Sequence, residues 1–274
     1  MTVDPAVVLR DLGLPGPDTV EPVTGGADAL LWRVRCGART YALRVLPPDR
    51  QTQARHEVTA LRALAGGEIP VPEVLAADTD ADRPAYLMDW IEGRPLAERL
   101  LDPTTPESVR RRLMTEFGRL QAMINARTGP EFADGPDWIA RRGDPVPGTT
   151  GPARLLHLDY HPLNVMVRED RIVAVLDWAN ATLGDPRYDL ARTESIIALL
   201  PDPDDSRAPL VRQALIDWRT GYAAGADPGA GADPGPEFRR WAARAMAADL
   251  EPRVGDPALP WLTEEHLARI RDYR

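Results

Sequence analysis

The segment from His157 to Asp177 limits the possible folds and reactions of this chain more than any other. It begins His-Leu-Asp-Tyr-His-Pro-Leu-Asn, and the strand-like run Arg171–Leu176 then ends at Asp177. A strand that follows a polar loop can return its last side chain to the same cleft, so Asp159, Asn164 and Asp177 are expected to lie together. One carboxylate to orient or deprotonate a hydroxyl, with further oxygen ligands for magnesium, is the set that phosphoryl transfer from a nucleotide requires.

A purely structural turn is the alternative interpretation of the same residues. Asp159, Pro162 and Asn164 would then only cap and bend the chain. The strand and its terminal Asp177 stand at the right distance for a phosphotransferase site, and we favour that interpretation.

Composition favours a soluble enzyme built as one large unit or two coupled lobes. The chain has 274 residues, 43% of them hydrophobic, and no apolar run long enough to span a bilayer. The net charge of −9 argues against nucleic acid or an anionic membrane as the main partner. The lone Cys36 cannot form an internal disulfide, and the first residues do not resemble a secretory signal. We therefore expect a cytoplasmic monomer or homodimer.

The chain contains no lysine, so the 33 residues counted as Lys or Arg are all arginines. A GC-rich genome is the simple explanation, yet the composition has a chemical consequence. Lysine nucleophiles and Schiff bases are excluded. Any phosphate-binding role that lysine usually fills must fall to arginine or to backbone N–H groups.

The residue pattern predicts an α+β fold with two lobes, residues 1–92 and residues 93–274. In the first lobe strands are predicted at 29–36, 39–46 and 84–91, and helices at 4–11 and 51–65. The second lobe reads as mainly helical, with Thr105 as the cap of its first helix and helices at 105–125, 187–199, 206–221, 238–250 and 263–272. Two Pro/Gly-rich segments, 143–152 and 223–236, interrupt the second lobe; the latter is either a passive linker or a lid.

Two features of the first lobe bear on nucleotide binding. Gly25 and Gly26 lie between strand candidates, where their backbone N–H groups can approach phosphates, although an ordinary hairpin turn fits the same residues. Arg44 lies inside an apolar strand, where a charge is costly unless it is paired. Glu57 on the following helix is the expected partner, in an ion pair that holds the helix against the sheet.

These residues together resemble the aminoglycoside phosphotransferase family, which shares the protein-kinase-like fold with choline, fructosamine and methylthioribose kinases. The resemblance covers residues 20–195 and is most specific from His157 onward, including Gly184-Asp-Pro and Tyr188-Asp-Leu. It implies a bilobal fold with a small antiparallel-sheet lobe and a mainly helical lobe. It also implies Mg²⁺ as cofactor, ATP or GTP as phosphoryl donor, and a small hydroxylated molecule as acceptor.

The resemblance also implies roles for individual residues. Asp159 would be the catalytic base, Asn164 and Asp177 the magnesium ligands, and His157 and Asp189 structural supports of the site. In the first lobe Arg44 takes the place of the family's phosphate-binding lysine, with Glu57 as its partner. The chain also departs from the family at Leu158, where the family commonly has glycine. The resemblance further implies that Asp185 lies near the acceptor pocket.

The strand that enters the junction of the two halves, Tyr86 to Gly93, is the expected adenine-binding segment. The resemblance implies that Asp89 and Ile91 contact the base through their main chain. Their side chains therefore carry no information about this contact.

The acceptor is the part of the function that the sequence leaves open. Acidic residues of the C-terminal part could bind a cationic antibiotic or an amine metabolite, the candidates being Asp217, Asp249, Glu251, Asp256, Glu264 and Glu265. Four tryptophans could line a cation-accepting pocket, but core packing explains them more simply: Trp138, Trp218, Trp241 and Trp261. Aminoglycoside, macrolide, peptide antibiotic, choline-like metabolite and sugar all remain candidates.

The sequence leaves two alternatives to a small-molecule kinase. A catalytically silent kinase-like binding module is suggested by Arg44, but Asp159, Asn164 and Asp177 are all present. A protein kinase is disfavoured because the sequence has no Asp-Phe-Gly or Ala-Pro-Glu segment with an activation loop between them.

Overall fold

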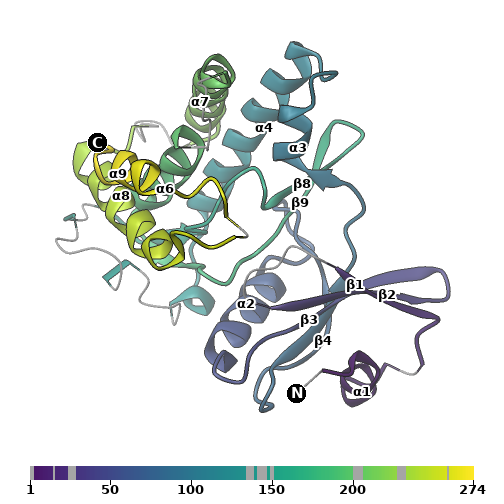
Figure 1. The fold of residues 1–274 in the computed structure, drawn as a ribbon. Coiled ribbons are helices and arrows are strands. Elements are labelled where there is room, and N and C mark those ends of the chain that lie inside the picture. The colour runs from purple at the N-terminus through teal and green to yellow at the C-terminus, as the bar shows by residue number, and fades with distance from the viewer. Residues whose placement is uncertain are drawn as a thin grey trace.

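The chain folds into a small sheet-rich lobe and a larger, mainly helical lobe (Figure 1). The structure is a computed structural model, and it describes residues 3–14, 16–23, 29–133, 139–140, 147–148, 151–199, 206–226, 233–257 and 259–274. Gly25 and Gly26 lie outside these described residues, as does Trp138.

A five-stranded antiparallel sheet forms the core of the small lobe. Its strands stand in the order β1-β2-β3-β5-β4, with bounds Thr19–Val23, Leu30–Cys36, Arg39–Val45, Ala85–Asp89 and Val74–Asp78. Successive side chains of a strand point to opposite faces, so β3 serves both sides of the sheet. Tyr41 and Leu43 pack on one face in a cluster with Leu9 of helix α1 (Pro5–Asp11). Arg44 lies on the other face, toward α2 (Gln51–Leu64).

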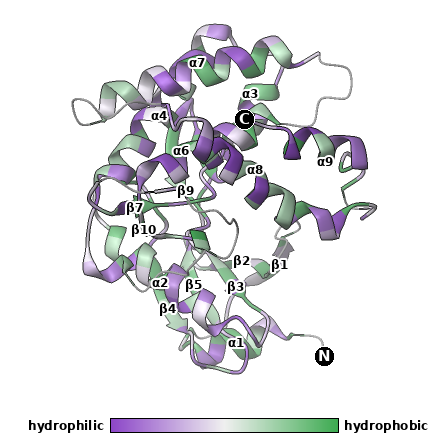
Figure 2. Cartoon of the chain, turned by 90° about the vertical axis from the view of Figure 1, so that its left-hand side faces the viewer, coloured by the Kyte–Doolittle hydropathy of each residue, from purple (hydrophilic) through white to green (hydrophobic). Residues whose placement is uncertain are grey.

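The larger lobe contains two small sheets and most of the helices. Strands β6 (Arg94–Pro95), β8 (Val165–Arg168) and β9 (Arg171–Val175) form one sheet, and β7 (Arg154–Leu156) pairs with β10 (Thr182–Gly184) in the other. The α-helices are α3 (Leu96–Leu101), α4 (Glu107–Ala126), α6 (Pro186–Ala198), α7 (Ala208–Gly225), α8 (Pro236–Leu250) and α9 (Glu264–Arg271). Short 3-10 turns lie at Pro130–Phe132 and Glu251–Arg253. Hydrophobic and hydrophilic residues alternate along α4, α7 and α8, as expected of helices with one buried face (Figure 2).

Helices α4 and α7 pack unusually close together because a glycine stands on each side of their contact. A Cβ atom on Gly118 would collide with the backbone of Trp218, and one on Gly221 would collide with the backbone of Thr115. This contact fixes α7 against the helix α4, which precedes the loop of residues 157–164 in the chain.

Gly93 marks the exit from the small lobe. Its φ of 144° belongs to a region that favours glycine, and a Cβ there would lie 2.6 Å from the Val167 carbonyl oxygen. The connection can therefore pass directly over β8, the strand that follows the loop of residues 157–164.

The sequence predicted the helices with ends shifted by a few residues at most, and it predicted β2, β3, β5 and β9. It missed the short strands β1, β4, β6, β7, β8 and β10 and the helix α3. Thr105 was predicted as a cap, and this is wrong: its hydroxyl donates to the Arg99 carbonyl, and Pro106 precedes α4 without a side-chain cap. Within the described parts of the chain, no helix combines the length and apolar character that crossing a membrane requires.

Candidate active site

His157 begins the loop that connects β7 to β8, and it is fully buried. Its Nε2 lies 3.0 Å from the Leu176 carbonyl oxygen, which can only accept, so Nε2 must donate the proton. The other ring nitrogen, Nδ1, then accepts from the Asp159 N–H at 3.3 Å. Burial lowers the pKa of His157, which favours this neutral ring. Both nitrogens are occupied, so the ring braces the loop and is not placed to bind a metal.

Leu158 has a φ of 62°, a conformation that costs an ordinary residue free energy and that glycine adopts easily. Two residues of α6, one turn apart, hold its backbone. Asp189 Oδ1 accepts from the Leu158 N–H at 2.7 Å, and Arg192 Nε donates to the Leu158 carbonyl at 3.3 Å. The Leu158 side chain is buried in a cluster that includes Phe238 and Trp241 of α8. Its apolar packing offsets the strain and explains how leucine can occupy this position.

Asp189 supports the loop from behind and is itself fully buried. While Oδ1 bonds the loop, Oδ2 accepts from Asn125 Nδ2 at 3.0 Å and from Gln121 Nε2 at 3.3 Å. Every oxygen of this carboxylate is therefore used by the protein. The structural role of Asp189 stays a prediction, which these hydrogen bonds favour.

Asp159 differs from Asp189 in that its side chain is 28% exposed. Oδ2 accepts from Asn164 Nδ2 at 3.0 Å and lies 3.5 Å from His161 Nε2. No described residue donates a hydrogen bond to Oδ1. Burial alone would raise the pKa of Asp159, but the hydrogen bond and charge of His161 and the charge of Arg192 hold it well below its usual range. The carboxylate is thus ionised at neutral pH and has one oxygen available to a hydroxyl group.

Asn164 precedes β8 and Asp177 follows the end of β9, and the antiparallel pairing of these strands brings the two residues together. The Leu176 N–H donates to the Asn164 carbonyl at 2.8 Å, and Asp177 follows directly with a φ of 62°. Asn164 uses its amide nitrogen to bond Asp159, and in the described part of the chain its Oδ1 accepts no hydrogen bond. The Asp177 side chain is 40% exposed. Two residues with side-chain oxygen donors therefore lie side by side at one end of the paired strands.

Arg44 and Glu57 form the ion pair that the sequence predicted. Arg44 Nη1 lies 2.7 Å from Glu57 Oε1, and the two side chains are only 15% and 2% exposed. Arg44 Nη2 also lies 3.7 Å from Asp177 Oδ1, so the guanidinium joins the small lobe to the end of β9. Burial raises the pKa of Glu57 to about 7, against the charge of Arg44, which lowers it.

The segment expected to contact adenine has a backbone N–H group at Ile91 that is left for a ligand. The Asp89 N–H donates to the Glu73 carbonyl at 3.0 Å and the Trp90 N–H to the Thr40 carbonyl at 3.2 Å. Among the residues that the structure describes, none accepts a hydrogen bond from the Ile91 N–H. Asp89 ends β5, so its position at the junction agrees with the prediction.

The donor set suits magnesium that is shared with a nucleotide. In the described ranges no group of three or more His, Cys, Asp or Glu side chains gathers at a point where it could hold a metal by itself. Asn164 and Asp177 supply two oxygens. Mg²⁺ commonly takes one or two protein ligands of this kind and completes its shell with phosphates and water.

Asp185 has a structural task that the sequence did not reveal. It caps α6, accepting from the Arg187 N–H at 3.0 Å, and it forms an ion pair with Arg187 Nη2 at 2.7 Å. Its side chain is 9% exposed. A contact between Asp185 and an acceptor stays a prediction, and the observed bonds compete with it.

Some supporting residues could have been found from the sequence and others could not. Gln121 and Asn125 are amides four residues apart on the buried face of α4, a polar interruption of an apolar stripe that signals a buried network. Arg192 carries no such signal. Of the tryptophans, Trp218 and Trp241 are fully buried in the core, as the simpler interpretation predicted.

The fold and the arrangement of these residues define a protein-kinase-like phosphotransferase. The sequence profile described as the phosphotransferase enzyme family matches residues 19–147 and 126–227, which together make up most of the chain. The chain belongs to this family.

Solved structures of small-molecule phosphotransferases share the whole fold. A Ralstonia eutropha protein described as a candidate aminoglycoside phosphotransferase is 20% identical with a TM-score of 0.70, covering 97% of this chain and 93% of its own. A mutant of aminoglycoside phosphotransferase APH(4)-Ia with AMP-PNP and hygromycin B is 16% identical with a TM-score of 0.64, covering 96% and 93%. Amicoumacin kinase hAmiN with AMP-PNP and Ca²⁺ is 14% identical with a TM-score of 0.63, covering 98% and 92%.

A relative of another kind is found in Arabidopsis thaliana. The protein named Probable acyl-CoA dehydrogenase IBR3 is 26% identical over 204 residues. The match covers 56% of this chain and 24% of that protein, so the matched part makes up about a quarter of the relative's length.

Proposed function

We propose that the protein transfers the terminal phosphoryl group of ATP or GTP to a hydroxyl group of a small molecule. The observation that carries this proposal is the free Oδ1 of an ionised Asp159, next to the oxygen donors Asn164 and Asp177. A carboxylate held in this way can orient a hydroxyl and accept its proton as the oxygen attacks phosphorus.

Each remaining residue has a positioning task in this proposal. Asn164 and Asp177 would hold Mg²⁺, which neutralises the charge of the nucleotide phosphates. Arg44 would donate to a phosphate oxygen, with Glu57 fixing the direction of its guanidinium. Arginine keeps its charge in this buried position, so it can replace the missing lysine, although with a wider fork of donors.

For the nucleotide base and phosphates, the proposal relies on backbone groups. The free Ile91 N–H and the main chain of Asp89 would bind the purine edge. Gly25 and Gly26 would approach the phosphates. Residues 1–92 would serve as the nucleotide-binding lobe and residues 93–274 as the catalytic and acceptor-binding lobe.

The acceptor class that we propose first is an aminoglycoside or another cationic antibiotic or amine. Proteins of similar fold were solved with hygromycin B and with the ligand of an amicoumacin kinase, which supports this class. The net charge of −9 favours a cationic acceptor electrostatically. Such an enzyme would work in the cytoplasm as a monomer or homodimer and would confer resistance where the acceptor is an antibiotic.

A hydroxylated acyl compound is the second candidate acceptor. It is favoured by the likeness to the Arabidopsis thaliana protein, whose name refers to acyl-CoA dehydrogenase. A phosphotransferase of this kind would activate a hydroxyl group on an acyl chain. The two classes differ in polarity, so one screen can separate them.

The test is mass spectrometry of pooled hydroxylated amines, antibiotics and acyl compounds after incubation with Mg-ATP or Mg-GTP. Asp159→Ala protein runs in parallel as the control. A phosphoryl mass gain on one compound, absent with the variant, supports the proposal and names the acceptor. If the wild type fails to bind either nucleotide in the presence of magnesium, the silent binding module becomes the better account.

A further inference from the structure

A cavity of about 400 Å³ lies between the N-terminal halves of α4 and α7, beside the end of α3. Its floor is apolar and includes Leu100, Met114 and Leu210. A smaller pocket of about 80 Å³ shares these three residues and continues to the catalytic loop. The two spaces together have the size and the mainly apolar lining that small-molecule sites commonly have.

The smaller pocket reaches the reaction centre through one side chain. Its wall includes His161, Pro162 and Leu163 of the catalytic loop. His161 Nε2 lies 3.5 Å from Asp159 Oδ2, so the pocket ends one imidazole ring away from the proposed base. Leu163 and Leu101 also line this pocket, and their side chains are 57% and 39% exposed. Large apolar side chains that are exposed in one patch are typical of a binding surface.

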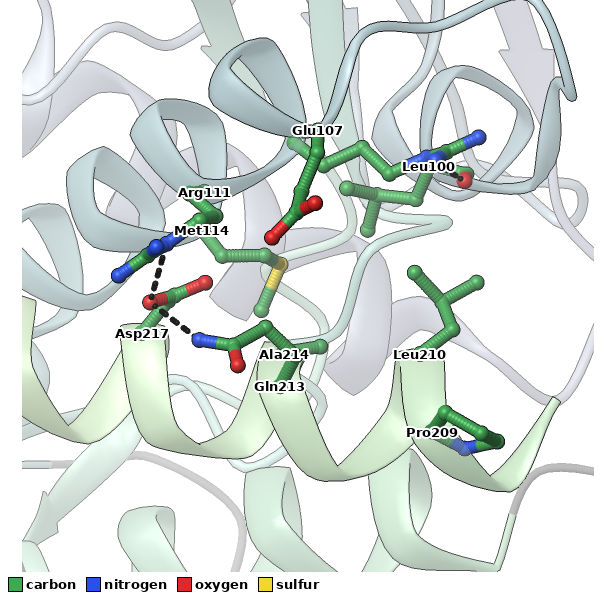
Figure 3. A pocket seen from close by; sticks show the side chains of 10 residues that line it. Leu100, Glu107, Arg111, Met114, Pro209, Leu210, Gln213, Ala214 and Asp217 are labelled. Carbon is green, nitrogen blue, oxygen red and sulfur yellow. Dashed lines mark hydrogen bonds and ion pairs between the residues drawn. The ribbon is translucent and has the colours of Figure 1, made fainter.

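The outer end of the larger cavity is polar, and its carboxylates face inward. Figure 3 shows the Glu107 carboxylate pointing into the space between the two helices. No described residue forms a hydrogen bond or ion pair with Glu107. Asp217 is buried and accepts from Gln213 at 3.0 Å, while Arg111 lies 3.5 Å away with an exposed side chain. This end is suited to a group that donates hydrogen bonds.

The other cation of the cavity is already engaged. Arg110 donates to the carbonyl oxygens of Leu100 and Asp102, at 2.8 and 2.7 Å. A ligand carboxylate would therefore compete with these bonds and would face two protein carboxylates. A ligand amine or amide would leave the Arg110 hydrogen bonds in place and could donate to the two protein carboxylates.

We propose that the joined cavities bind the non-reacting part of the acceptor. The acceptor is then a hydroxylated molecule with an apolar segment against Leu163 and Leu210 and a hydrogen-bond-donating end, an amine or an amide, between Glu107 and Asp217. This inference rests on the proposed function, because it places the hydroxyl at Asp159. Within the cationic class proposed above, it favours an amine or amide with an apolar segment over an aminoglycoside, which is polar along its whole length.

The binding test uses 6-amino-1-hexanol as the probe and 2-aminoethanol as the short control, followed by NMR with Mg-AMP-PNP present. Ala214 lines both cavities, so Ala214→Leu fills space that the probe's chain would occupy. Excluding about two methylene groups should weaken probe binding about tenfold. Binding of 2-aminoethanol and of Mg-AMP-PNP should not change. Equal affinities of wild type and variant for the probe would overturn the inference.

A second variant guards against a folding defect in α7. Leu101→Gln changes a side chain that is already 39% exposed, and it should weaken binding of the probe about threefold through lost apolar burial.

The polar end of the cavity is tested with Glu107→Gln, which removes the charge of the carboxylate. If the natural ligand end is an amine, this variant should bind the amine probe about threefold more weakly and bind the N-acetyl derivative of the probe as the wild type does. If both probes lose affinity alike, the ligand end is an amide. If neither does, the polar end is wrongly placed.

The direction of the bound probe is measured separately. Mn²⁺ in place of Mg²⁺ should broaden the NMR signal of the CH₂OH group more than that of the CH₂NH₂ group. Equal or reversed broadening would contradict the placement of the hydroxyl at Asp159. Failure of the wild type to bind any nucleotide, with the probe still bound and sensitive to Ala214→Leu, would contradict the proposed function and leave the cavity as a binding site.

Discussion

The catalytic loop, residues 157–164, has a front and a back that use the same residue type in opposite ways. At the back, Asp189 is fully buried and both its oxygens accept hydrogen bonds from the protein. At the front, Asp159 is 28% exposed and keeps Oδ1 without a donor among the described residues. A carboxylate with both oxygens engaged by the protein stabilises a fold, and one with a free oxygen can act on a substrate.

The difference also explains how a strained loop is maintained. Leu158 and Asp177 both have positive φ angles, and such residues persist only where their surroundings over-determine them. The back of the loop holds these conformations in place through the hydrogen bonds of Asp189, Arg192 and the buried His157. The front can then present its polar groups without depending on them for stability.

The largest effect is expected at the front. Asp159→Ala should lower turnover by roughly 10²–10⁴, the usual contribution of a positioned acid–base group, because the acceptor hydroxyl loses its proton acceptor. Initial rates with the acceptor identified by mass spectrometry measure this, and circular dichroism checks the fold. Turnover within about threefold of the wild type would remove Asp159 from the reaction.

The next effect concerns the metal. Asp177→Asn should weaken Mg-nucleotide binding by roughly tenfold or more, because one anionic oxygen donor is lost. Isothermal titration with and without Mg²⁺ measures this. Asp80→Asn, at a carboxylate of the sheet-rich lobe that is 77% exposed, is the control for a change of charge alone. If both variants bind alike, Asp177 is not a ligand.

At the back, glycine should be better tolerated than alanine. Leu158→Ala loses buried apolar surface and keeps the strain of positive φ, so it should lower the free energy of unfolding by about 2–5 kcal/mol. Leu158→Gly loses the same packing but relieves the strain, and should be more stable than the alanine variant by about 1 kcal/mol. Urea unfolding of both variants decides this, and the opposite order would contradict the strain at Leu158.

The smallest effect is a pH dependence that comes from Glu57. Its pKa is about 7 in the folded protein, above the ordinary value of 4.5, so the folded state holds the proton more tightly than the unfolded state. The resulting stabilisation is present below about pH 4.5 and is lost as pH rises through 7, a change of at most about 3 kcal/mol. Urea unfolding at several pH values should show this loss in the wild type and not in Glu57→Gln. Parallel profiles would contradict it.

Much of the front could be predicted from the sequence, because Asp159, Asn164 and Asp177 lie within about twenty residues and one loop and one strand connect them. The pairing of Arg44 with Glu57 was also predictable, since an arginine inside an apolar strand needs a buried partner. The fold class followed from the same motifs.

The back and the acceptor cavity were not predictable to the same degree. Arg192 reaches Leu158 only because α6 packs behind the loop, and nothing in its neighbourhood in the sequence indicates this contact. Glu107 and Asp217 are 110 positions apart and line the same cavity only because α4 packs closely on α7. Such contacts depend on tertiary packing and leave no local pattern.

The most direct test of the two-sided loop compares Asp159→Asn with Asp189→Asn, measuring turnover and urea unfolding for each. In the second variant the new side-chain amide would face the donors Nδ2 of Asn125 and Nε2 of Gln121, so Asp189→Asn should lower the free energy of unfolding by about 3 kcal/mol. Asp159→Asn should lose turnover and change the free energy of unfolding by less than about 1 kcal/mol. If Asp159→Asn proves the more destabilising of the two, or retains full turnover, the division between a supporting back and a reacting front is wrong.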